Sequence, residues 1–181
     1  AEVQKLSFDE GEFFATPTDA KRATGRYEFS NPIAAPWTEP RVVQNPQLMA
    51  VVEAMLGPRV EIDTFSTVTS VPGAPDQHWH RDAGFLYDEL RMPLPAHGIV
   101  AFIPLRNVTT AHGPTQFIPA SHLPCMMNES PRARPVATME NFLLDLCDAA
   151  LAQRLLAPTA TVGSVVFFDF RVFHRGLGNR H

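Results

Sequence analysis

The chain has 181 residues, of which 45% are hydrophobic and 19% are charged, and this composition is typical of one globular domain with a real core. Its net charge of −4 gives no electrostatic reason to expect nucleic acid or an anionic membrane as a partner, and no apolar run is long enough to cross a bilayer. Its two cysteines, Cys125 and Cys147, form no CxxC pair and no disulfide framework, which favours a reducing compartment such as the cytoplasm.

Residues 1–57 are expected to support the domain and to contain one clear helix. Asn45 can cap a helix, Pro46 suits its first position, and Gly57-Pro58 can end it. Between them lies an apolar stripe that we expect to face the core, made of Leu48, Val51, Val52, Met55 and Leu56. The sequence therefore predicts a helix over residues 46–56.

From Val60 onward the pattern changes from helical to alternating, which indicates strands. Residues 60–68 predict one strand, and a turn at 72–75 leads to a second strand that contains residues 77–82. Further strands are expected at residues 97–105, at 115–118 and after Gly163, with a helical insertion over 138–156. The 17 prolines predict long connections, so the fold class is mainly β with supporting helices, a sandwich or a barrel.

One short stretch carries residues that can bind a metal. A strand rises about 3.3 Å per residue and alternate side chains share a face, so His80 and Asp82 project the same way and can close on one ion. His78 has the same parity and is a rival ligand, although it would stand about 13 Å from Asp82 along a straight strand. The third ligand must come from elsewhere, and His174 is the best candidate, while Asp169 is expected to be structural. Two imidazoles and one carboxylate leave half of the positions of an octahedral iron open.

Three motifs follow one another between residues 58 and 181, and together they resemble the phytanoyl-CoA dioxygenase family. They are Gln77-x-x-His80-x-Asp82, then the segment HGPTQFIPASH over residues 112–122, then His174-x-Gly-x-x-Asn. The resemblance implies a single oxygenase domain over 1–181, with a double-stranded β-helix (a cupin-like jelly roll) over 58–181. It favours His80, Asp82 and His174 as the metal ligands, and it implies that Gln77 and Thr115 contact 2-oxoglutarate.

The same resemblance implies an Fe(II)- and 2-oxoglutarate-dependent dioxygenase that uses O₂ to hydroxylate a C–H bond of a small molecule, with release of succinate and CO₂. The family usually binds the far carboxylate of 2-oxoglutarate with an Arg after the distal His, beyond the last residue of this chain, so we expect a C-terminal strand to be missing. Two alternatives stay open. The same three side chains can hold Zn²⁺ in a cupin-like hydrolase or isomerase, or the chain can be a non-catalytic binding relative with the same fold.

Overall fold

The computed structural model describes residues 21–23, 25–32, 34–87, 92, 94–123 and 154–181. In these ranges the chain is mainly β, with short strands that pair antiparallel in three small sheets. The first sheet contains β1 (Lys21–Ala23), β2 (Arg26–Ser30) and β3 (Ser66–Ser70), in that order; the second pairs β4 (Ile99–Phe102) with β6 (Val166–Asp169); the third pairs β5 (Thr115–Phe117) with β7 (His174–Gly176).

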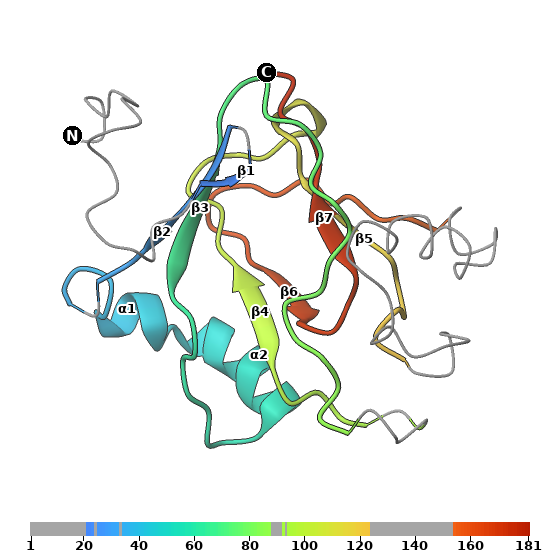
Figure 1. Cartoon of the computed structure of the whole chain (residues 1–181). Coiled ribbons are helices and arrows are strands. Elements are labelled where there is room, and N and C mark those ends of the chain that lie inside the picture. The colour runs from blue at the N-terminus through green and yellow to red at the C-terminus, as the bar shows by residue number, and fades with distance from the viewer. Residues whose placement is uncertain (1–20, 24, 33, 88–91, 93, 124–153) are drawn as a thin grey trace.

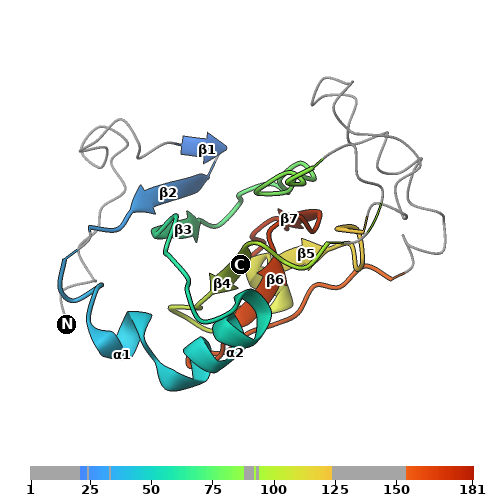
Figure 2. The same cartoon turned by 90° about the horizontal axis from the view of Figure 1, so that it is seen from below.

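The three sheets stand next to one another. Figure 1 shows the β2–β3 ribbon on one side, β5 and β7 on the other, and β4 and β6 between them, and the turned view in Figure 2 agrees. The helices α1 (Pro40–Val43) and α2 (Pro46–Leu56) lie at the lower end in Figure 1. No helix in the part of the chain described above has the length and apolar character needed to span a membrane.

Helix α2 has the bounds that its sequence predicts. The Asn45 side chain accepts hydrogen bonds from the backbone N–H groups of Gln47 (3.0 Å) and Leu48 (3.3 Å), so two of the unpaired N–H groups at the helix start are satisfied. The expectation that its apolar stripe is core is wrong, because no residue of the helix is buried and Val51 and Met55 are 37% and 40% exposed. The helix lies at the end of the molecule rather than between the sheets (Figure 1).

The predicted strands are found at shorter lengths. The strand expected over 60–68 begins only at Ser66, and Ile62, predicted to lie within it, is 63% exposed. The strand expected over 97–105 narrows to Ile99–Phe102. Of the helix predicted over 138–156, residues 138–153 lie outside the described ranges, as do Cys125 and Cys147. Leu156 is not helical, because it exchanges backbone hydrogen bonds with Phe117.

The apolar core that bears on function lies where the β4–β6 and β5–β7 pairs meet. Phe117 of β5, Phe168 of β6 and Val172 of the following turn are buried together. The Phe117 and Phe168 rings lie 4.9 Å apart, and the Phe168 ring lies 4.8 Å from the imidazole of His174. The core therefore supports the first residue of β7 from one side.

Candidate metal centre

The segment that contains the Gln-x-x-His-x-Asp motif pairs with β7 in a fixed register. His80 and His174 exchange both backbone hydrogen bonds, at 3.0 and 2.8 Å, and Gln77 N–H donates to the carbonyl of Gly176 at 2.8 Å. Within residues 77–82, only His80 forms a β-bridge, to His174. The prediction of a full strand over 77–82 is therefore wrong, although the segment does pair with β7. Because His80 and His174 face each other directly across the pair, their side chains lie on one face.

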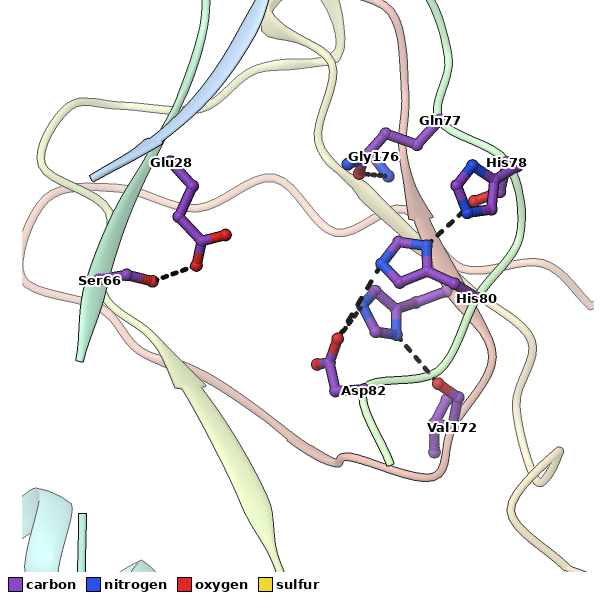
Figure 3. Close-up of polar contacts among 9 residues, drawn as sticks. Glu28, Ser66, Gln77, His78, His80, Asp82, Val172 and Gly176 are labelled. Carbon is purple, nitrogen blue, oxygen red and sulfur yellow. Dashed lines mark hydrogen bonds and ion pairs between the residues drawn. The ribbon is translucent and has the colours of Figure 1, made fainter. Parts of the chain in front are cut away.

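The register brings three candidate ligands together. Oδ1 of Asp82 lies 3.7 Å from Nε2 of His174 and 4.0 Å from Nε2 of His80, and one ligand atom from each residue lies within 4.8 Å of the other two. The two imidazole centroids are 4.4 Å apart. Figure 3 shows the His80 ring with the Asp82 carboxylate below it. The sequence predicted this constellation, and the structure brings all three residues to one point.

A local hydrogen bond orients each imidazole. Nδ1 of His80 lies 3.0 Å from the carbonyl oxygen of His78, and Nδ1 of His174 lies 3.0 Å from the carbonyl oxygen of Val172. A carbonyl oxygen only accepts, so each Nδ1 carries a proton, and in the neutral ring this leaves the lone pair on Nε2, the nitrogen nearer Asp82. Metal-binding histidines commonly have such a partner on the other ring nitrogen.

The surroundings of His80 favour its neutral imidazole form. Burial lowers the pKa of His80 below its ordinary 6.5, and the neighbouring His174 and His78 rings lower it further, against the opposing effects of the His78 carbonyl and Asp82. The His174 side chain is 4% exposed, whereas the Asp82 side chain is 35% exposed. The centre is therefore closed behind His174 and open on the side of the carboxylate.

The donor set fits a divalent ion. Ligand atoms at about 2.1 Å from one ion lie about 3 Å apart, so the three ligand atoms, which lie within 4.8 Å of one another, would close on the ion by rotation of their side chains. Neutral imidazole nitrogen and carboxylate oxygen are the ligands of non-haem Fe(II) sites, and they also suit Zn²⁺. The arrangement can therefore hold a metal and leave positions open for other ligands.

The two residues that the family resemblance assigns to 2-oxoglutarate lie next to the centre. Oε1 of Gln77 accepts a hydrogen bond from the backbone N–H of Gly176 at 2.8 Å. Thr115 pairs with Gly176, and Phe117 pairs with His174, so strand alternation places Thr115 on the face of the β5–β7 pair that carries His174. Both residues are near the metal ligands, and their contact with a cosubstrate stays a prediction.

The charges of Lys21, Arg22 and Arg26 predict a solvated face, and this prediction is wrong for Arg26 of β2. It is 5% exposed, and its Nη2 donates to the carbonyl oxygens of Leu177 (3.0 Å) and Pro75 (3.4 Å). In the sequence, the alternation of polar and aromatic residues over 26–29, Arg-Tyr-Glu-Phe, indicates a half-buried strand.

Three other polar residues, His78, Asp169 and His112, lie outside the ligand group. His78 is exposed, and its ring lies beside that of His80 at 5.5 Å but outside the ligand group. Asp169 is structural, because its carboxylate accepts hydrogen bonds from Nε (2.8 Å) and Nη2 (2.6 Å) of the buried Arg171. His112 belongs to a 3-10 turn, Thr110–His112, and its Nδ1 lies 2.8 Å from the hydroxyl of Thr109.

Comparison with known proteins gives one family and several similar folds. A family model described as phytanoyl-CoA dioxygenase matches residues 2–180. The structure of AviO1 from Streptomyces viridochromogenes Tue57 is similar, with 19% identity and a TM-score of 0.55 over 86% of this chain and 61% of that one. EvdMO1 has 20% identity and a TM-score of 0.52 over 90% of this chain and 34% of its own.

A third similar structure was solved with ligands. HygX from Streptomyces hygroscopicus, with nickel, 2-oxoglutarate and hygromycin B bound, has 13% identity and a TM-score of 0.57 over 88% of this chain and 67% of that one. At these identities the likeness establishes the fold. The chain spans 61% and 34% of the lengths of the AviO1 and EvdMO1 chains.

Proposed function

Since the chain belongs to the phytanoyl-CoA dioxygenase family, we propose that it is a non-haem Fe(II)- and 2-oxoglutarate-dependent dioxygenase that hydroxylates a C–H bond of a small molecule. The observation that carries the proposal is the convergence of His80, Asp82 and His174, whose ligand atoms lie within 4.8 Å of one another. We also propose that the three small sheets are parts of a double-stranded β-helix, which the similar folds support.

The three ligands would hold Fe(II) through two imidazole nitrogens and one carboxylate, which leaves half of an octahedral shell for 2-oxoglutarate and O₂. Bound together, these groups would supply the oxidising power for hydroxylation, with release of succinate and CO₂. The chain's own part is to orient both rings through the bonds from Nδ1 to the carbonyls of His78 and Val172, which favour the neutral tautomer whose Nε2 can bind the metal. The buried Phe117 and Phe168 rings next to His174 exclude water from that side.

We place 2-oxoglutarate beside Gly176. The Gln77 carboxamide has N–H donors besides the oxygen that Gly176 occupies, and the Thr115 hydroxyl is a further donor, so both can bind a carboxylate without adding charge beside the iron. Arg26 adds a positive charge at the same place, since its guanidinium lies against Gly176. HygX, which is similar in fold, binds a metal and 2-oxoglutarate, and this supports a site for both groups in this fold.

The test replaces the ligands one at a time. His174→Ala and Asp82→Gly are expected to abolish 2-oxoglutarate-dependent succinate formation and to weaken Fe(II) binding at least tenfold, while the far-ultraviolet circular dichroism spectrum stays that of a folded protein. His78→Ala is the matched control, because His78 has the same strand parity but lies outside the ligand group, and it should retain metal and turnover. Hydroxylation at the normal rate by Asp82→Gly would refute the ligand assignment.

Metal analysis together with measurement of 2-oxoglutarate turnover separates this function from its two rivals. A Zn²⁺ hydrolase or isomerase would be active without O₂ and would form no succinate from 2-oxoglutarate. A non-catalytic relative would show no decay of 2-oxoglutarate even when saturated with Fe(II). Succinate formation that requires both Fe(II) and O₂ excludes both rivals.

A further inference from the structure

The three candidate ligands differ in how they are oriented. Each imidazole has a hydrogen bond from its Nδ1 to a carbonyl of its own segment. The carboxylate of Asp82 accepts no hydrogen bond from the residues that the structure describes, and its polar contacts there are the two imidazoles, at 3.7 and 4.0 Å. Its side chain is also 35% exposed, so its neighbours cover it only in part. The position of this ligand therefore depends on its backbone.

At Asp82 the backbone leaves the regular antiparallel ladder. His80 and His174 exchange both hydrogen bonds, and the next pair of this kind would be Asp82 with Val172. The Val172 carbonyl instead accepts from Nδ1 of His174. The N–H of Asp82 donates to the carbonyl of Phe170 at 3.0 Å, and the N–H of the next residue donates to the same oxygen at 3.2 Å. One carbonyl oxygen thus accepts both hydrogen bonds from the backbone at this ligand.

Phe170 is held in place by the residues just before β4. Its N–H donates to the carbonyl of Gly98 at 3.4 Å, and its ring stands edge-on to the imidazole of His97, with the centroids 4.8 Å apart. The ring also covers Gly98: a Cβ added there would overlap Cε2 and Cζ of Phe170 and would lie 2.8 Å from Cδ2. The ring therefore occupies space that only a glycine at residue 98 leaves free.

The residues on either side of Phe170 are bound to each other and to the same segment. Nε and Nη2 of Arg171 donate to the carboxylate of Asp169 at 2.8 and 2.6 Å. Nη2 of Arg171 also lies 3.3 Å from the carbonyl oxygen of Leu94 and 3.4 Å from that of Pro95, and it donates to both. Arg171 is 2% exposed, so the turn over 169–172 has little freedom to move relative to residues 94–98. The carbonyl of Phe170 consequently has a fixed direction.

We propose that Phe170 is a positioning residue for the metal centre: its carbonyl, fixed through the ring on Gly98, places the backbone of Asp82 so that the carboxylate meets the two imidazoles. This inference rests on the proposed function, because it takes Asp82 as a metal ligand. Groups that orient a metal ligand typically contribute about tenfold to hundredfold to metal affinity. A loss of that size is expected when the Phe170 carbonyl is displaced.

Gly98→Ala tests the proposal, because the added Cβ must displace the Phe170 ring. Hydrogen exchange followed by NMR in the full chain without metal reports on the amides of Asp82 and Ala83. These amides should be protected in the wild type and should exchange at least tenfold faster in the variant. The amide of His80, which donates to β7 instead, is the internal control and should keep its protection, so a general loss of stability would be recognised.

Metal binding gives the second readout. Titration of the full chain with Ni²⁺, a divalent ion that imidazole binds strongly, should show an affinity at least tenfold lower for Gly98→Ala. In an Asp82→Gly background Gly98→Ala should cause no further loss, because Phe170 acts through the carboxylate that is already gone. Gly84→Ala, where the Cβ meets nothing within 4 Å, is the matched control and should leave exchange and affinity unchanged. If Gly98→Ala does not fold, Phe170→Leu replaces it, because it removes the ring without adding a side chain.

Three results would overturn the inference. They are amides of Asp82 and Ala83 that exchange freely in the wild type, exchange and Ni²⁺ affinity that Gly98→Ala leaves intact, and an equal loss of affinity with and without the Asp82 carboxylate. Turnover is measured separately, as succinate formed from 2-oxoglutarate with Fe(II) and O₂. A wild type that binds Ni²⁺ but forms no succinate would refute the proposed function and leave the role of Phe170 in metal binding standing.

Discussion

Gly176 offers a quantitative test of how tightly the centre is assembled. An alanine Cβ at this position would lie 2.6 Å from Nη1 of Arg26 and 2.7 Å from Oε1 of Gln77, closer than real Cβ contacts. Both side chains must move, and overpacking of this kind costs about 1–3 kcal/mol. Moving Gln77 also weakens the 2.8 Å hydrogen bond between its Oε1 and Gly176 N–H, worth about 1 kcal/mol. We expect Gly176→Ala to destabilise the protein by about 2–4 kcal/mol.

Denaturant unfolding at equilibrium measures this loss, and isothermal titration with Fe(II) under anaerobic conditions should show weaker binding, because His174 is two residues away on the same face. Gly84→Ala is the matched control: Gly84 is likewise two residues from a ligand, Asp82, but a Cβ there meets nothing within 4 Å. In an Arg26→Ala background the Gly176→Ala penalty should fall. A Gly176→Ala protein within 0.5 kcal/mol of the wild type, or an undiminished penalty in that background, would refute the steric argument.

Two further predictions concern the turn that leads into β7. Asp169→Asn leaves the buried Arg171 without its carboxylate and should cost about 3–5 kcal/mol in denaturant unfolding. Burial raises the pKa of Asp169, but the hydrogen bonds from Arg171 outweigh this effect and hold the pKa below 3.8. The stabilisation by the ion pair should therefore be complete above pH 3.8 and be lost as the pH falls through the lowered pKa of the folded protein. An advantage of the wild type over Asp169→Asn that persists in stronger acid would contradict this. Ser121→Ala removes the acceptor of the buried Phe173 N–H at 2.8 Å and should cost about 1–3 kcal/mol, whereas Ser164→Ala, at an exposed loop, should change thermal stability little.

The sequence predicted the metal ligands because their signal is local or motif-based. The i, i+2 spacing of His80 and Asp82 places both on one face whenever the segment is extended, even though only a single bridge at His80 is regular. The start of α2 was equally readable, since Asn45 and Pro46 act through their own backbone geometry. In both cases the local conformation depends on residues that are close together in the sequence.

The errors have the opposite origin. The apolar stripe of α2 satisfies the helical period, but the period does not say whether another element covers it, and here Val51 and Met55 stay exposed. The burial of Arg26 could not be predicted because it depends on β2 pairing with β3, some forty residues away in sequence. The alternation of residues 26–29 indicates a strand, but only the register shows that its polar face is turned inward.

The metal centre depends above all on one register. Each imidazole is oriented by a carbonyl within its own segment, His78 for His80 and Val172 for His174, so each strand prepares its ligand independently. Only the pairing of the two segments brings the rings together, and a slip by one residue would turn His174 to the opposite face. At Gly176 two features favour this register: the backbone and side-chain bonds of Gln77, and the Arg26 guanidinium, which a larger side chain would displace. A slip that put Arg175 or Leu177 there would break these contacts, so the contacts that hold the segments together also favour the alignment that forms the centre.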